Sequence, residues 1–153
     1  MVKIQLHAYL PFSAVERNGQ TMINIVVATH GDLSESLLHC AYMIAGGSGL
    51  PGIYSLCMRE GKGVDEYLAD AQAIIDKAPS KDFILLVDLM SASPCNFTLS
   101  AFRNCNYRMI TGVNLAMLIE IIDNRDDMTL DELWEYGRSS AIDSIQKVYL
   151  ANE

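Results

Sequence analysis

The stretch Ile25-Val26-Val27-Ala28-Thr29-His30-Gly31-Asp32 decides the fold class, because it reads as a buried strand followed by a turn. Four small or β-branched apolar residues in a row are typical of a strand inside a parallel sheet. The chain then turns at Gly31, and Asp32 followed by Glu35 predicts a helix with Asp32 as its N-cap. His30 is therefore expected at the carboxyl tip of a strand, beside a helix N-terminus. Ligands of open α/β sheets bind at that edge, and helix N-termini favour anions.

The composition predicts one domain with a sizeable core. The chain has 153 residues, 50% of them hydrophobic, and a net charge of −8. This charge disfavours nucleic acid and anionic membrane surfaces as partners and suits a protein with a basic face. No apolar run approaches the roughly 18 residues of a membrane span and no signal peptide pattern opens the chain, so we expect a cytoplasmic protein. Its four cysteines show no metal-ligand spacing and are expected to be reduced and mostly buried: Cys40, Cys57, Cys95 and Cys105.

Residues 1–21 do not fit the pattern of the rest of the chain. Alternating apolar residues in the first ten positions are compatible with a short strand, but Pro11 stops it and the next residues are polar. One interpretation is an added edge strand or a partner-binding arm. The other, which we favour, is a flexible leader or a sequence added upstream. The domain itself is then expected to span residues 22–153.

Beyond the first strand, short apolar runs alternate with segments whose apolar residues recur at helical spacing. The further strands are expected at 53–58, 83–87 and 107–111, and the helices at 34–45, 64–78, from 93 onward, around 117–122 and over 130–148. This order predicts a three-layer α/β fold, with a central, mainly parallel sheet of four or five strands and helices on both faces. An open edge strand and a long apolar last helix favour a homodimer.

Two more polar groups are expected at the edge that carries His30. Asp88 directly follows the strand at 83–87, and a carboxylate there needs a partner because burying an unpaired charge is costly. Ser93 before Pro94 predicts a helix start with Ser93 as N-cap. A hydroxyl and a second helix N-terminus therefore join His30 and Asp88. Lys62, on another strand-end loop, is interpreted as a solvated lysine.

Two loops superficially suggest ligand binding but lack the defining residues. The glycine-rich loop 46–52 has no Gly-Lys-Ser/Thr ending and follows a helix instead of a strand, so it is not a P-loop. The acidic segment 123–127 lacks the ligand spacing of a calcium loop. We expect neither a metal nor a cofactor.

Three motifs stand in order at the expected strand ends, and together they resemble a known family. They are Thr29-His30-Gly31, Val87-Asp88 followed by Ser93-Pro94-Cys95-Asn96, and Gly112-Val113-Asn114 with Met117-Leu118-Ile119-Glu120. Over about residues 22–150 the chain resembles the EIIA component of mannose-family sugar phosphotransferase systems (mannose, fructose, sorbose and N-acetylgalactosamine type). The resemblance implies a phosphohistidine carrier that accepts phosphate from HPr and passes it to the EIIB component for sugar uptake, meeting the membrane only indirectly.

The resemblance also implies roles for single residues. His30 would be the phosphorylated nucleophile, Asp88 would orient it, and Ser93, Ala92 and Gly31 would bind the phosphoryl group. This chemistry is coherent without the family. A neutral imidazole can attack phosphorus through one ring nitrogen while a carboxylate accepts the proton carried by the other, and donors at a helix N-terminus stabilise the phosphoryl charge.

The chain departs from the family in the loop before Ser93, where Ser91-Ala92 replaces the common Gly-Gly and an aromatic residue often found near Met90 is absent. Two alternatives stay open. One is the phosphotransfer subunit of a dihydroxyacetone kinase, which tends to have Gly-Gly-Thr after the third strand. The other is a non-catalytic regulatory or receiver-like module phosphorylated on Asp88. A receiver needs acidic residues after its first strand to bind magnesium, and none precedes Asp32. The sequence does not name the sugar.

Overall fold

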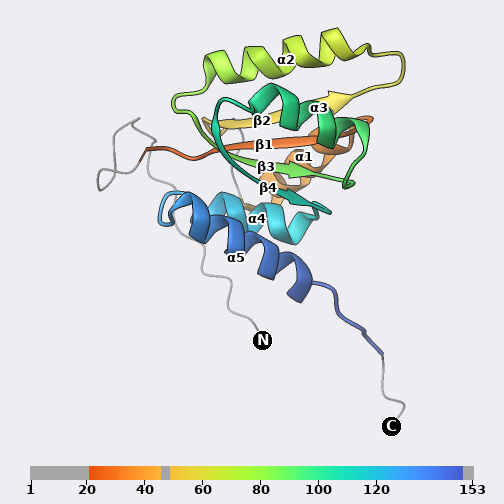
Figure 1. Ribbon diagram of the computed structural model, residues 1–153. Helices are drawn as coiled ribbons and strands as arrows, with labels where there is room; N and C mark the ends of the chain where they lie inside the picture. Colours follow the sequence, from red (N-terminus) through yellow and green to blue (C-terminus); the bar gives the residue numbers. More distant parts are fainter. Residues whose placement is uncertain (1–20, 46–48, 150–153) are drawn as a thin grey trace.

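The computed structural model describes residues 21–45 and 49–149, and strands and helices alternate in it as the sequence predicts (Figure 1). The strands are β1 (Asn24–His30), β2 (Ile53–Met58), β3 (Asp82–Val87) and β4 (Asn106–Thr111). The helices are α1 (Leu33–Ala45), α2 (Val64–Lys77), α3 (Ser93–Phe102), α4 (Leu115–Asn124) and α5 (Leu130–Asp143). No helix in this described part of the chain is long and apolar enough to cross a membrane.

The four strands form one parallel sheet in the order β2-β1-β3-β4. The two central strands pair with Ala28 opposite Val87. Their apolar residues are fully buried, from Ile25 to Ala28 in β1 and from Phe83 to Val87 in β3. This explains why both strands read as continuous apolar runs, since a central parallel strand is covered on both faces.

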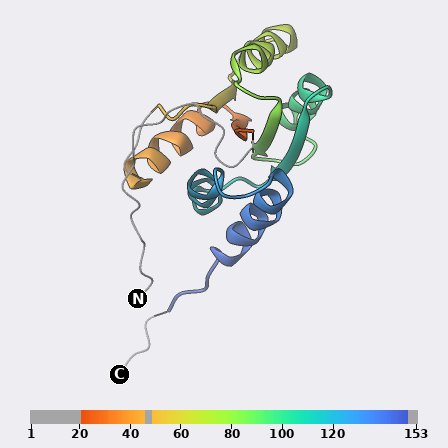
Figure 2. The ribbon, with the colours of Figure 1, turned by 90° about the vertical axis from the view of Figure 1, so that its left-hand side faces the viewer.

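Alternate side chains of the central strands pack into separate halves of the core. Ile25 and Val27 belong to the half that contains residues of α1, α4 and α5, whereas Val26 and Ala28 belong to the half that contains residues of α2 and α3. Figure 2 shows these two groups of helices on opposite sides of the sheet. The expected three-layer α/β architecture is therefore confirmed.

The order of the strands creates a crevice at the carboxyl edge of the sheet. From β1 the chain crosses to β2 on one side, and from β2 it crosses back to β3 on the other side of β1. The connections that follow β1 and β3 therefore run in opposite directions. In open α/β sheets such a switch point is where ligands bind.

The last helix is shorter than the sequence predicts. The apolar spacing of Ile145 and Val148 predicts that they belong to it, but α5 ends at Asp143 and these side chains are 78% and 88% exposed. The hydroxyl of Ser144 donates to the carbonyl of Ala141 at 2.7 Å, which satisfies one of the orphan acceptors at the helix end. Helical spacing of apolar residues therefore predicts a longer helix than forms, because spacing does not tell whether these residues reach the core.

The predicted extension, residues 1–21, lies outside the described residues except for Thr21. The hydroxyl of Thr21 donates to the carboxylate of Asp82, at the amino end of β3 and therefore at the edge opposite His30. Part of the glycine-rich loop 46–52 also lies outside the described residues, because these do not include 46–48.

Candidate active site

The switch point brings His30 and Asp88 into direct contact. The carboxylate oxygen Oδ2 of Asp88 lies 2.8 Å from Nδ1 of His30 and also accepts the backbone N–H of His30 at 2.9 Å. The other oxygen, Oδ1, accepts the N–H of Leu89 at 2.8 Å. Both oxygens of the carboxylate are therefore engaged, and the ring of His30 is held at the sheet edge.

These bonds determine the charge of the carboxylate and the tautomer of the imidazole. Burial raises the pKa of the Asp88 carboxyl, but the bonds from the His30 amide, the His30 ring and the Leu89 amide outweigh it, so the pKa lies below its usual value. An ionised carboxylate only accepts hydrogen bonds, so Nδ1 must carry the proton. In the neutral imidazole, Nε2 is then the ring nitrogen with a free lone pair. The side chain of His30 is 46% exposed, against 13% for Asp88.

Backbone bonds from the third motif fix the end of β3. The N–H of Gly112 donates to the carbonyl of Asp88, and the N–H of Val113 donates to that of Val87, each at 3.0 Å. Gly112 adopts φ 77°, a conformation that glycine reaches without strain. Asn114 then caps α4, since its side chain accepts the N–H of Met117 at 2.8 Å. This motif therefore supports Asp88 from the neighbouring strand.

The turn from β1 into α1 corrects one detail of the sequence analysis. Asp32 stands at the cap position, and its carbonyl accepts the N–H of Ser36 at 3.1 Å. Its carboxylate, however, bonds to Arg59, and the hydroxyl of the buried Thr29 accepts the N–H of Ser34 at 2.8 Å. The strand residue Thr29 therefore takes the capping bond assigned to Asp32.

The start of α3 corrects a second detail. The helix begins at Ser93, and its N-cap is Ala92, which has no side-chain acceptor. Ser93 is therefore the first helical residue and Pro94 the second. The hydroxyl of Ser93 is not used as a cap and stands exposed. The predicted helix start is thus one residue off, but Ser93 is at the predicted edge of the sheet.

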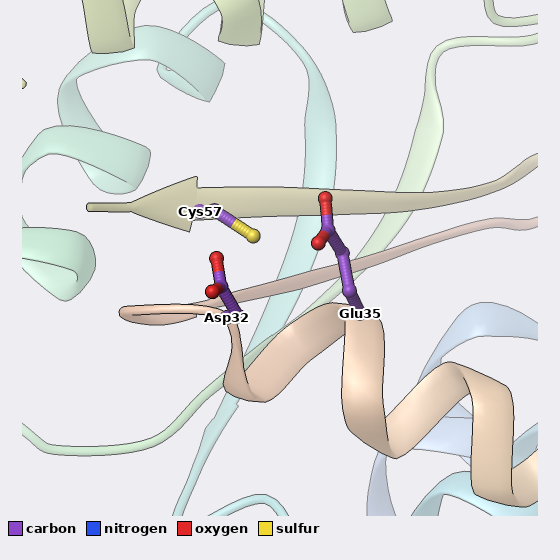
Figure 3. A group of neighbouring side chains, drawn as sticks. All are labelled: Asp32, Glu35 and Cys57. Carbon is purple, nitrogen blue, oxygen red and sulfur yellow. The ribbon is translucent and has the colours of Figure 1, made fainter.

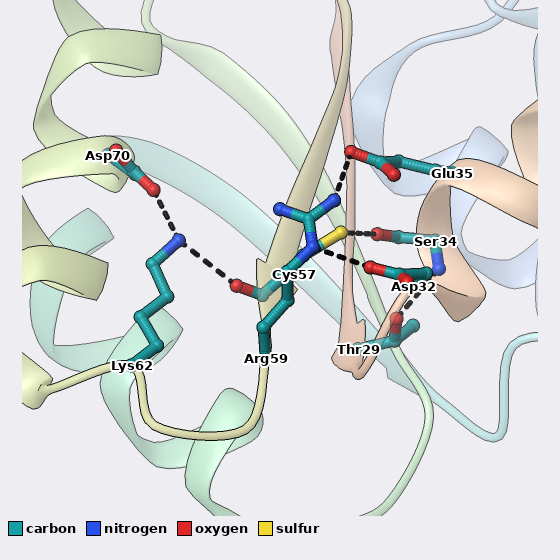
Figure 4. A network of polar contacts seen from close by, with 8 residues as sticks. All are labelled: Thr29, Asp32, Ser34, Glu35, Cys57, Arg59, Lys62 and Asp70. Atoms are coloured by element: carbon teal, nitrogen blue, oxygen red, sulfur yellow. Dashed lines mark hydrogen bonds and ion pairs between the residues drawn. The ribbon is translucent and has the colours of Figure 1, made fainter.

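Arg59 joins two carboxylates beside the site. Its Nε bonds to Asp32 at 2.5 Å and its Nη2 bonds to Glu35 at 2.7 Å, as Figure 4 shows. Ligand atoms of Asp32, Glu35 and Cys57 lie within 4.8 Å of one another, and their side chains converge in Figure 3. Both carboxylates are paired with Arg59, however, and Sγ of Cys57 is 3.0 Å from the Ser34 hydroxyl. Each member of this group therefore already has a partner.

Lys62 is not the solvated lysine that the sequence predicts. Its side chain is only 9% exposed, and its Nζ donates to the carbonyl of Cys57 at 3.2 Å and pairs with Asp70. The ammonium also lies 5.9 Å from the ring centroid of Tyr67. A cleft of about 380 Å³ beside it is lined by Arg59, Lys62 and neighbours from β2 and α2, but not by His30. Lys62 therefore stabilises the loop after β2, and its charge is paired with Asp70.

Three interactions around the site were missed by the sequence analysis: the pairing of Arg59 with α1, the capping bond of Thr29, and a bond from Asn96 to Ser91. Only the pairing of Arg59 could have been predicted from the sequence, because Arg59 and Asp32 follow two strands that lie next to each other in the sheet. All four cysteines are free thiols; Cys57 and Cys95 are buried, whereas Cys40 is exposed, so the expected burial holds only for some of them.

The fold and this geometry define a class: a parallel α/β protein with an imidazole, oriented by a carboxylate, at the switch point of its sheet. Residues 24–136 match the family described as "PTS system fructose IIA component" (EIIA-man), which is well over half of the chain. The chain therefore belongs to the mannose family of EIIA components of sugar phosphotransferase systems.

Bacterial relatives agree with this assignment. The chain is 22% identical over 121 residues to the sorbose-specific EIIA component of Klebsiella pneumoniae, covering 78% of this chain and 87% of the relative. It is 25% identical over 127 residues to the fructose-specific EIIA component of Bacillus subtilis (strain 168), covering 82% and 86%. The crystal structure of an EIIA component from Streptococcus agalactiae shares the fold, with a TM-score of 0.75 at 22% identity over 82% of this chain and 97% of that one.

Proposed function

We propose that this protein is a phosphohistidine carrier that accepts a phosphoryl group from HPr on His30 and passes it to an EIIB component. The observation that carries the proposal is the bond between Nδ1 of His30 and Oδ2 of Asp88 at 2.8 Å. It directs the lone pair of Nε2 outward from a half-exposed ring. An exposed nucleophile suits a reaction between two proteins, because the donor must reach it in line.

The transfer needs little covalent chemistry from the protein. Nε2 attacks the donor's phosphorus, an N–P bond forms, and the bond between phosphorus and the donor breaks with its electron pair leaving on the donor. The ring becomes positively charged, and the Asp88 carboxylate stabilises that charge through the Nδ1 proton. The second transfer repeats the step with His30 as the leaving group. Positioning and charge stabilisation supply most of such catalysis.

The donors for the phosphoryl oxygens are proposed at the start of α3. The first N–H groups of a helix have no intrahelical acceptor and attract anions. The Ser93 hydroxyl, its amide and the amide of Ala92 are the groups we assign to this role. The resemblance also implies phosphate binding by Gly31, but its N–H donates to the carbonyl of Met58 at 2.9 Å. We therefore assign Gly31 to the turn, where its φ is 55°.

The geometry disfavours the alternative in which Asp88 itself is phosphorylated. Both of its oxygens already accept hydrogen bonds, and the nearby carboxylate of Asp32 is paired with Arg59. A receiver needs such carboxylates to hold magnesium beside the phosphorylated aspartate. A phosphoryl group on histidine nitrogen is stable in alkali, whereas an acyl phosphate on Asp88 is hydrolysed there, so treatment with alkali separates the two.

The partners follow from the family and belong to the same proposal. We place the exchange in the cytoplasm, which suits four free thiols, and we propose a homodimer as the working form. The exposed apolar residues at and beyond the end of α5, Ile142, Ile145, Val148 and Tyr149, support it, because such surface is typical of an interface.

Reconstitution tests the assignment. The protein is incubated with phosphoenolpyruvate, HPr and the kinase that charges HPr, and is then mixed with a mannose-family EIIB component or with the subunits of a dihydroxyacetone kinase. We expect this chain to lose its phosphoryl group only when EIIB is added. Transfer to the kinase subunits alone would assign the protein to that system instead.

A further inference from the structure

Ser91 has an unusual backbone conformation in the loop between β3 and α3. Its φ is 62°, and among residues 21–45 and 49–149 it is the one non-glycine residue with a positive φ. An L residue with a side chain rarely occupies this region, whereas glycine does so freely. Something in this chain must therefore hold the conformation that glycine adopts without help.

Asn96 supplies two hydrogen bonds to this turn. Its side-chain Nδ2 donates to the carbonyl of Ser91 at 3.1 Å, and its backbone N–H donates to the carbonyl of Ala92 at 3.0 Å. Two consecutive carbonyls are thus tied to one residue in the first turn of α3. The N-cap, Ala92, has no side chain that can make a capping bond. At the other end, the N–H of Leu89 is tied to Asp88.

We propose that Asn96 is a positioning residue, which holds the Ser91–Ala92 turn so that the Ser93 hydroxyl and the first amides of α3 face the phosphoryl group on His30. This inference rests on the proposed phosphocarrier function. Without the Nδ2 bond, Ser91 would relax toward a negative φ, and the peptide planes between Ser91 and Ser93 would rotate. The donors would then miss the phosphoryl oxygens while the helix itself remained intact.

Four variants separate this role from a general loss of structure. Asn96→Ala removes the side-chain donor, and Asn96→Asp replaces it with a carboxylate that can only accept. Ser91→Gly lets residue 91 adopt a positive φ without the bond from Asn96. Ser91→Gly combined with Asn96→Ala tests whether a glycine at position 91 compensates for the loss of that bond. The matched control is Asn124→Ala, which removes a similar bond from an asparagine Nδ2 to a backbone carbonyl, that of Glu120 at 2.8 Å, in α4.

The rate of His30 phosphorylation is measured with charged HPr and with phosphoramidate, a small donor that needs no protein docking. Asn96→Ala should slow both reactions by about ten- to a hundredfold, as small displacements of catalytic groups commonly do. Asn96→Asp should be at least as slow. Ser91→Gly and Asn124→Ala should react like the wild type, and the double variant should recover to within about threefold of Ser91→Gly.

A spectroscopic readout reports the geometry directly. In the wild type, phosphorylation should move the amide proton resonance of Ser93, because that amide would donate to the phosphoryl group. The movement should be lost in Asn96→Ala and restored in the double variant. A variant that merely weakened α3 would not regain it through a glycine at position 91.

Each result has a defined meaning. Slow transfer by Asn96→Ala with rescue by Ser91→Gly supports the inference. Wild-type rates in Asn96→Ala, or a slow Asn96→Ala that Ser91→Gly does not rescue, overturn the inference and leave the phosphocarrier function standing. Failure of the wild type itself to become phosphorylated on His30 contradicts the proposed function, and the positioning role falls with it.

Discussion

His30 depends on Asp88 for its orientation and for the location of its proton. Oδ2 accepts both the ring Nδ1–H and the backbone N–H of His30, so one oxygen fixes the ring and the strand end together. Because Asp88 is only 13% exposed and paired, its charge acts at short range on the imidazole. The two residues therefore operate as a unit.

Replacing Asp88 with Asn should slow phosphoryl transfer without unfolding the protein. The amide is nearly isosteric and can accept from Nδ1–H, but it carries no negative charge and can also donate, which favours the wrong tautomer. We expect a loss of at least about a hundredfold, roughly 2.7 kcal/mol of barrier. Rapid-quench kinetics with charged HPr measure it, and a circular dichroism spectrum checks the fold. Transfer at the wild-type rate would mean that Asp88 is only a strand-end residue.

The same variant should change how stability responds to acid. The folded-state pKa of Asp88 lies below its value in the unfolded chain, so its contribution is present above about pH 3.9 and is lost as the pH falls through the folded pKa. Urea unfolding should therefore show a shallower loss of stability on acidification in Asp88→Asn than in the wild type. An exposed control at the end of α5, Asp143→Asn, should follow the wild-type curve. Parallel curves for all three proteins would contradict the pairing.

The sequence was sufficient to place His30, Asp88 and Ser93 because His30 ends a strand, Asp88 directly follows one and Ser93 begins a helix, and local sequence patterns indicate each of these boundaries. It was not sufficient for the side chains of Asp32 and Lys62. Asp32 has the right spacing for a cap but turns to Arg59, which is distant in the chain. Lys62 looked solvated because its partners come from another element and a backbone carbonyl. The direction in which a long polar side chain points depends on its neighbours in the folded protein, and a local sequence pattern does not identify those neighbours.

At the scale of elements, local signals predicted some helix boundaries and missed others. The spacing of Thr129 and Glu132 is typical of a capping box, and the structure forms one at the start of α5, with the Glu132 carboxylate 2.9 Å from the N–H of Thr129. The predicted end of α5 was wrong because the apolar residues after Asp143 continue the helical spacing but do not pack against the core of the described residues. The predicted N-cap of α3 was wrong by one residue. Serine often caps helices, but here Ala92 occupies the N-cap position and Ser93 is the first helical residue.

The contact between α4 and α5 depends on a glycine in the middle of α5. A Cβ at Gly137 would lie 2.5 Å from Cδ1 of the fully buried Ile121. Gly137→Ala should therefore destabilise the protein by about 1 kcal/mol, since overpacking costs about 1–3 kcal/mol and outweighs the gain of roughly 1 kcal/mol in helix propensity. Urea unfolding measures this, with the exposed Ser139→Ala as control. A more stable Gly137→Ala would show that α5 is not closely packed there.

At the scale of the whole molecule, residues 21–45 and 49–149 leave apolar surface exposed around the end of α5. Ile145 and Val148 are 78% and 88% exposed. We expect a homodimer at micromolar concentration in sedimentation experiments. Ile145→Asp with Val148→Asp should shift it toward the monomer, because charges at an interface core are unfavourable, while Gln146→Asp should not. A wild-type monomer under these conditions, or a dimer unaffected by the double variant, would contradict this arrangement.

In the proposed function, Nε2 of His30 is the reactive nitrogen and faces the partner protein, and the proposal depends on this more than on any other feature. It is tested most directly by locating the phosphoryl group on the charged protein, with peptide mass spectrometry for the residue and ¹H–¹⁵N correlation of the imidazole for the nitrogen. Because Asp88 holds Nδ1, we predict one phosphoryl group on Nε2 of His30 and none in His30→Ala. A phosphoryl group on Nδ1 of His30, or one that persists in His30→Ala on His39 or Asp88, would contradict the proposed mechanism.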